Sequence, residues 1–114
     1  MTEDGEIRIF AALDFIRDNA SAYAKAKADR VFLEEFRKTK KALLMQVAER
    51  AGHKSAVAQE REAYAAEDYA AHLQALSAAV EEEERLRWLM VAAQARIEAW
   101  RSLESSRRVE ARTL

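Results

Sequence analysis

The chain contains no cysteine and no proline, and only two of its 114 residues are glycine. The absence of cysteine excludes disulfides, thiolate nucleophiles and cysteine-ligated zinc sites. Proline and glycine are the residues that most disfavour a helix interior, so almost nothing in this chain interrupts helical structure. Alanine, glutamate, arginine, lysine and leucine, which are good helix formers, are abundant instead. The composition therefore predicts an all-α protein.

Long apolar runs and a strong net charge are also missing. No segment approaches the roughly 20 apolar residues of a membrane-spanning helix, and the first residues, from Met1 to Glu6, are acidic where a signal peptide would be basic. The formal net charge is -1, which provides no global attraction to nucleic acid or to membranes. We expect a cytoplasmic protein without a membrane partner.

What the sequence does contain is a helical pattern of apolar residues with one clear break. Apolar side chains recur at intervals of three and four over residues 9–47 and again over 69–103, which is the spacing of amphipathic helices. Between them, Gly52 can take the left-handed conformation that ends a helix, and Ser55 can cap the next one. We expect a single domain, residues 1–114, with a helix over about 6–51, a turn over 52–55, a short helix over about 56–66, and a long helix over about 68–108 that follows a kink near residue 67.

The apolar face of the last helix does not suggest a strict seven-residue repeat. A repeat counted from Tyr69 places Glu83, Arg87, Gln94 and Arg101 on the seam, and charged seam positions disfavour a long regular supercoil. We therefore expect this helix to be a member of a bundle.

The predicted long helices are too slender to enclose a core by themselves. About 40 residues at roughly 1.5 Å each form a rod of roughly 60 Å, and two such rods leave apolar stripes uncovered. We expect a long antiparallel helical hairpin that assembles into a bundle by oligomerisation, with a dimer favoured. For the two tryptophans, stacking on single-stranded bases is the alternative to a core or interface role. The residues expected at the oligomer interface are Phe32, Phe36, Leu43, Trp88, Ile97 and Trp100.

The distribution of charge supports the hairpin. Residues 25–41 carry seven basic side chains against three acidic ones, and residues 55–84 carry eight acidic side chains against one basic one. A bend at Gly52 places residue i opposite the residue numbered about 107 minus i, so the basic block faces the acidic block. Such pairing selects orientation more than it adds stability, because exposed ion pairs contribute about 0–1 kcal/mol each.

Two basic clusters are candidates for nucleic-acid contact. The segment 37–41 (RKTKK) resembles a phosphate-binding patch, with internal pairing across the hairpin as the alternative. Lys40 and Lys41 lack an acidic residue four positions earlier and are expected to remain free. The C-terminal arginines should overhang the hairpin and have few internal partners, with solvation of a frayed helix end as the alternative to nucleic-acid contact. The candidate nucleic-acid-binding residues are Lys40, Lys41, Arg107, Arg108 and Arg112.

Catalytic and metal sites are not expected. His53 and His72 each follow an acidic residue by four positions, but a metal site needs at least three protein ligands; we interpret His53 as a turn residue and His72 as a helix-surface residue. The glutamates 81–84 point in four directions around a helix and should pair one turn away with Arg85 and Arg87. There is no Gly-rich phosphate loop or nucleophile elbow. We expect no enzymatic activity, no cofactor and no small-molecule substrate.

Two segments resemble small uncharacterised all-helical proteins of tailed bacteriophages and prophages. They are residues 23–45 (YAKAKADRVFLEEFRKTKKALLM) and 82–101 (EEERLRWLMVAAQARIEAWR), and the resemblance extends over residues 23–108. Such genes often lie among phage replication and recombination functions, so the resemblance implies an accessory role in DNA metabolism, in the cytoplasm of the bacterial host. Proteins of this group often carry proline near position 67 or 68, which this chain lacks.

Two functions are compatible with these observations. The first is a non-enzymatic, oligomeric phage protein that assists DNA recombination or replication by contacting DNA or a recombination or replication protein. The second is a structural or protein-binding helical module, used in virion assembly or host takeover, that makes no nucleic-acid contact.

Overall fold

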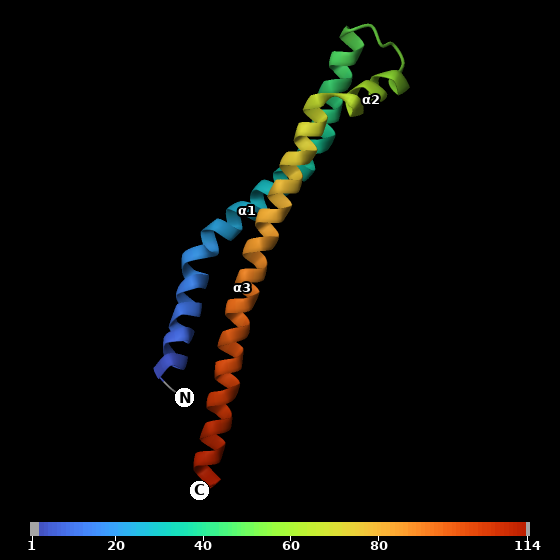
Figure 1. The fold of residues 1–114 in the computed structure, drawn as a ribbon. Coiled ribbons are helices and arrows are strands. Elements are labelled where there is room, and N and C mark those ends of the chain that lie inside the picture. Colours follow the sequence, from blue (N-terminus) through green and yellow to red (C-terminus); the bar gives the residue numbers. More distant parts are fainter. Residues whose placement is uncertain (1–2, 114) are drawn as a thin grey trace. The chain divides into compact units, whose positions relative to one another are not determined.

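The structure is a computed structural model that describes residues 3–113, and it is all-helical over this range (Figure 1). Its helices are α1 (Glu3–Arg50), α2 (Ala56–Ala65) and α3 (Glu67–Thr113). The predicted all-α class is confirmed. Helix α1 begins before the expected position near residue 6, and α3 continues beyond the expected end near 108. None of these helices combines the length and the apolar content that a membrane span requires.

The turn after α1 has the chemistry that the sequence indicates. Gly52 has a φ of 107°, a left-handed conformation that only glycine adopts without strain. The Gly52 N–H donates to the Glu49 carbonyl at 3.1 Å and the His53 N–H donates to the Ala48 carbonyl at 3.1 Å, which is a Schellman C-cap. The Ser55 hydroxyl accepts a hydrogen bond from the Ala58 N–H at 3.1 Å. Both the predicted helix stop and the predicted N-cap are confirmed.

A second break separates α2 from α3. Ala66 is extended, with φ −69° and ψ 142°, and its carbonyl accepts hydrogen bonds from the N–H groups of Tyr69 and Ala70 at 3.1 and 3.2 Å, so α3 starts directly after it. The rings of Tyr64 and Tyr69 meet edge to face across the break, with centroids 5.2 Å apart. The kink expected near residue 67 is present, one residue earlier and without proline or glycine.

The chain forms two compact units, and α1 and α3 contribute to both. One unit consists of residues up to Ala24 together with residues from Glu84 onward, and the other spans Lys25–Glu83. Within each unit the segments of α1 and α3 run antiparallel, because residues later in α1 lie beside residues earlier in α3. In the second unit Arg30 contacts Glu83 and Leu33 contacts His72.

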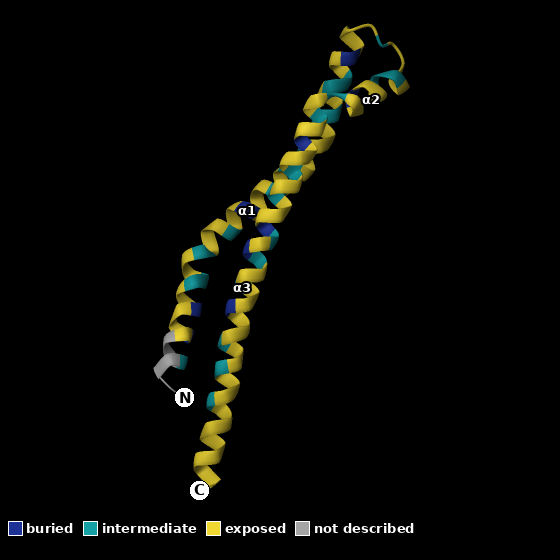
Figure 2. Cartoon of the chain, viewed as in Figure 1, coloured by how far each residue is buried: buried dark blue, intermediate teal, exposed yellow. Residues whose placement is uncertain are grey.

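The least exposed residues of α3 recur at alternating intervals of three and four (Figure 2). This is a heptad seam, and it includes Glu83 but leaves Gln94 and Arg101 exposed. The heptad repeat that was counted from the sequence placed the next seam position four residues after Tyr69. In the structure this interval is three residues, to His72, so the predicted phase of the repeat was wrong. The seam residues of α3 are Tyr69, His72, Leu76, Ala79, Glu83, Leu86, Met90, Ala93, Ile97, Trp100 and Glu104.

The core is small and rich in alanine. The buried apolar residues are Ile9, Ala12, Ala26, Ala48, Ala63, Leu86 and Ala93, and no large side chain among the described residues is completely enclosed. Alanine lets two helices approach closely, but each alanine removes little apolar surface from water.

Candidate functional site

Arg30 of α1 and Glu83 of α3 form a part-buried ion pair within the Lys25–Glu83 unit. The Arg30 Nε atom donates to Oε2 of Glu83, and Nη2 donates to Oε1 of the same carboxylate at 3.2 Å. The remaining nitrogen, Nη1, donates to Glu34 at 2.8 Å. Glu83 is only 7% exposed. The hydrogen bond to Glu83 and the attraction of Glu34 raise the pKa of the Arg30 guanidinium. The sequence predicted Arg87 as the partner of Glu83; the contact that the structure shows is the bond to Arg30, while Arg87 pairs with Glu84 at 2.7 Å.

His72 is not the surface residue that the sequence suggested. It is 9% exposed, its Nε2 lies 2.7 Å from the Leu33 carbonyl oxygen, and its ring packs against Phe36 with centroids 6.0 Å apart. Because a carbonyl oxygen only accepts, Nε2 must carry the proton in this contact. The correction has a simple reason: the seam of α3 passes through position 72, so the ring faces α1.

A hollow lined by basic and aromatic side chains lies among α1, α2 and the start of α3, within the Lys25–Glu83 unit. It has a volume of about 330 Å³. We call it the basic-aromatic hollow, and its lining residues are Arg37, Lys38, Lys41, Tyr64 and Tyr69.

Lys41 contacts both an acidic and an aromatic side chain in this hollow. Its side chain is 29% exposed and its Nζ lies 3.5 Å from a Glu60 oxygen and 4.8 Å from the centroid of the Tyr64 ring. The hydrogen bond with Tyr64 and the attraction of Glu60 raise the pKa of Lys41. The prediction that Lys41 remains free is therefore wrong, because α2 brings a carboxylate and a phenol to it. Lys40 is partly exposed and does not line the hollow.

The C-terminal arginines lie in a continuous helix. Arg107 donates to Glu104 at 3.3 Å, and Arg108 and Arg112 are exposed. Their contact with nucleic acid stays a prediction.

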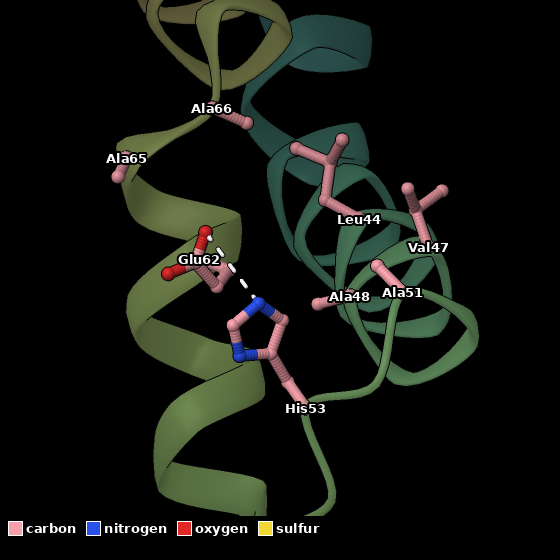
Figure 3. A pocket seen from close by; sticks show the side chains of 8 residues that line it. All are labelled: Leu44, Val47, Ala48, Ala51, His53, Glu62, Ala65 and Ala66. Atoms are coloured by element: carbon pink, nitrogen blue, oxygen red, sulfur yellow. Dashed lines mark ion pairs between the residues drawn. The ribbon is translucent and has the colours of Figure 1, made fainter.

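A second hollow lies beside the turn, between the end of α1 and α2 (Figure 3). Its volume is about 240 Å³ and its polar groups are His53 and Glu62, whose side chains approach to 4.0 Å. The Gln59 side-chain amide donates to the His53 carbonyl at 2.9 Å and so ties the turn to α2. One imidazole and one carboxylate do not make a metal site, and no cluster of three or more possible ligands occurs within residues 3–113. The other lining residues are Leu44, Val47, Ala48, Ala51, Ala65 and Ala66.

The six predicted interface residues fall into two groups. Phe32, Leu43 and Trp88 are 62%, 48% and 59% exposed, whereas Phe36, Ile97 and Trp100 are partly covered. The indole Nε1 of Trp100 is buried and has no hydrogen-bond partner among the described residues. The arginine side chain that precedes Trp88 lies over its ring, 4.5 Å from the centroid.

The sequence indicated part of the basic-aromatic hollow and missed the rest. Arg37, Lys38 and Lys41 belong to the basic segment that the sequence identified, but Tyr64 and Tyr69 were not associated with it. A signal was available, because the hairpin register that sums to about 107 places Lys41 opposite a residue next to the α2–α3 break.

No protein-family model matches this chain, and no curated protein and no solved structure matches it significantly.

Proposed function

We propose that this chain is a non-enzymatic, self-associating helical protein, a long hairpin that assembles into a bundle. The observation that supports self-association is the imbalance between covered and exposed apolar side chains. No large side chain among residues 3–113 is completely enclosed, whereas phenylalanines, a tryptophan, leucines and valines are exposed by 37–70%. Soluble monomers rarely expose large contiguous apolar patches.

A second copy is the partner that the chain itself provides. In a symmetric dimer the same patch is used twice, so Phe32 and Leu43 would each be covered by the partner's copy of the same surface. The helices already pair by a heptad seam, and a second pair of helices is the usual way to cover the remaining flanks of such a pair.

The biological role that we propose is that of an accessory factor in phage DNA recombination or replication in the bacterial cytoplasm. The resemblance of residues 23–108 to phage proteins supports this context, and the basic residues of α1 and of the α3 terminus support nucleic-acid contact. The alternative is a helical module of virion assembly or host takeover that binds protein alone, which the exposed apolar residues support equally.

Two measurements test the proposal. Light scattering over a micromolar concentration range should give a mass of at least twice 13.0 kDa; a constant monomer mass would contradict self-association. Anisotropy titrations with single- and double-stranded oligonucleotides at about 50 mM salt should show binding that weakens as salt increases. Failure of this second measurement would remove the nucleic-acid role and leave the protein-binding alternative.

A further inference from the structure

Two cations at the rim of the basic-aromatic hollow have no ion-pair partner within the part of the chain that the structure describes. Arg37 and Lys38 are both exposed, and neither forms an ion pair with any residue of the range 3–113. From spacing alone, Lys38 would pair with Glu34 one turn earlier. That carboxylate instead accepts a hydrogen bond from Arg30 at 2.8 Å, so the Arg30–Glu34 contact leaves Lys38 available.

The third cation organises the wall of the hollow. Lys41 is balanced by Glu60 at 3.5 Å, so it adds little net charge, but it lies over the Tyr64 ring at 4.8 Å. Tyr69 meets the same ring edge to face, with an interplanar angle of 73°. Tyr64 is thus held on two sides while 48% of it remains exposed. The result is a fixed aromatic surface beside two unpaired cations.

We propose that the basic-aromatic hollow binds single-stranded nucleic acid, with backbone phosphates at Arg37 and Lys38 and a base or sugar against Tyr64 and Tyr69. This inference rests on the proposed nucleic-acid role and names its site. Cations that follow the backbone, combined with aromatic side chains that contact the bases, are the usual composition of single-strand sites. A volume of about 330 Å³ lies within the range of pockets that hold small ligands, which suits one nucleotide of a longer strand.

The basic-aromatic hollow contains only part of the nucleic-acid site expected from the sequence. Lys40 and the C-terminal arginines lie outside the hollow. Lys41 acts as a positioning residue that orients Tyr64. The phosphate contacts belong to Arg37 and Lys38.

The test is an anisotropy titration of the full chain with a fluorescein-labelled oligothymidylate at several salt concentrations. The variant R37A/K38A removes both free cations. The matched control K27A/R61A also removes one lysine and one arginine; both are exposed and neither lines the hollow. R37A/K38A should bind at least fivefold more weakly than the control. Its slope of log K against log salt should be smaller in magnitude by about 1.4, since each phosphate contact contributes about 0.7 for single strands.

The aromatic part is tested separately. Y64L should weaken binding about tenfold, as expected for loss of one aromatic–base contact, while Y64F, which retains the ring, should bind like the parent. Circular dichroism of each variant establishes that the helices are intact. Equal weakening by Y64L and Y64F would overturn the role of the ring.

The outcomes separate the site from the wider function. Equal affinities of R37A/K38A and K27A/R61A, with the parent binding the oligonucleotide, would overturn the site and leave nucleic-acid binding to other residues. Absence of binding by the parent at about 50 mM salt would overturn both the site and the nucleic-acid role. Release of the oligonucleotide by equimolar inorganic phosphate would show that the hollow recognises the ion alone, which would also overturn the proposal.

Discussion

Replacing Phe32 with alanine should weaken self-association while leaving the helices formed. The ring is 62% exposed and stacks on Phe36, with centroids 5.5 Å apart and an interplanar angle of 18°. The substitution therefore removes one contact within the chain and one exposed apolar surface that a second copy would cover.

The free energy lost from association and the free energy lost from folding differ in size. An aromatic side chain offers roughly 200 Å² of surface, so the exposed part of Phe32 corresponds to roughly 120 Å². At about 25 cal/mol per Å², covering it stabilises a complex by up to about 3 kcal/mol per copy. The stacked ring pair contributes about 0.5–1.5 kcal/mol within the chain. Association should therefore be affected more than folding, with a dissociation constant increased up to about 100-fold for each ring covered.

Sedimentation equilibrium over a dilution series measures the dissociation constant, and circular dichroism measures helix content in the same samples. Phe32→Tyr is the matched control, because it retains the ring and should associate like the parent. The reasoning is refuted if Phe32→Ala and the parent dissociate over the same concentration range while both remain helical, since the ring would then lie outside any interface.

Four further outcomes follow from the contacts within the chain. Leu86→Ala truncates a side chain that is 3% exposed and should lower the free energy of unfolding by about 2–5 kcal/mol; a change in denaturant midpoint no larger than that of a surface substitution would contradict its burial. Gly52→Ala places a Cβ at φ 107°, where no atom lies within 4 Å, so only backbone strain of about 1–3 kcal/mol should appear in thermal unfolding. Glu83→Gln should lower the melting temperature in the parent but much less in a background carrying Arg30→Gln, and equal effects in both backgrounds would argue against a direct pair. Lys41→Gln should lower the melting temperature by a constant amount from neutral pH to about pH 9. The raised pKa of the lysine means that its stabilising contribution is complete below the ordinary value of 10.5 and is lost as the pH rises above it; a loss of the contribution near neutral pH would contradict this assignment.

The features that the sequence predicted correctly are those encoded by local chemistry. Gly52 and Ser55 act through their own conformation and through backbone groups within a few positions, so the turn could be recognised without knowledge of the fold. The all-α class likewise follows from helix propensity summed over long segments.

The features that were missed depend on neighbours across helices. Glu83 and His72 look like surface residues in a single helix, and only the phase of the seam turns them toward α1. Lys41 looks unpaired along α1 because its partner, Glu60, belongs to α2. Spacing along one helix identifies neighbours at three and four positions, but it does not determine the rotation of that helix against the next.

The joint between α2 and α3 illustrates the opposite dependence, that of local conformation on distant contacts. Ala66 is extended, although alanine has the highest helix propensity of all residues, and no proline or glycine lies between residues 53 and 114. The local sequence would therefore allow residues 56–113 to form one uninterrupted helix. We infer that contacts of α2 with the rest of the chain prevent α2 and α3 from joining into one helix. These contacts include the burial of Ala63 and the packing of the Lys41 ammonium group over the Tyr64 ring. A fragment that begins after the turn and lacks α1 should become helical through position 66, so the conformation of this one alanine reports whether α1 is in place.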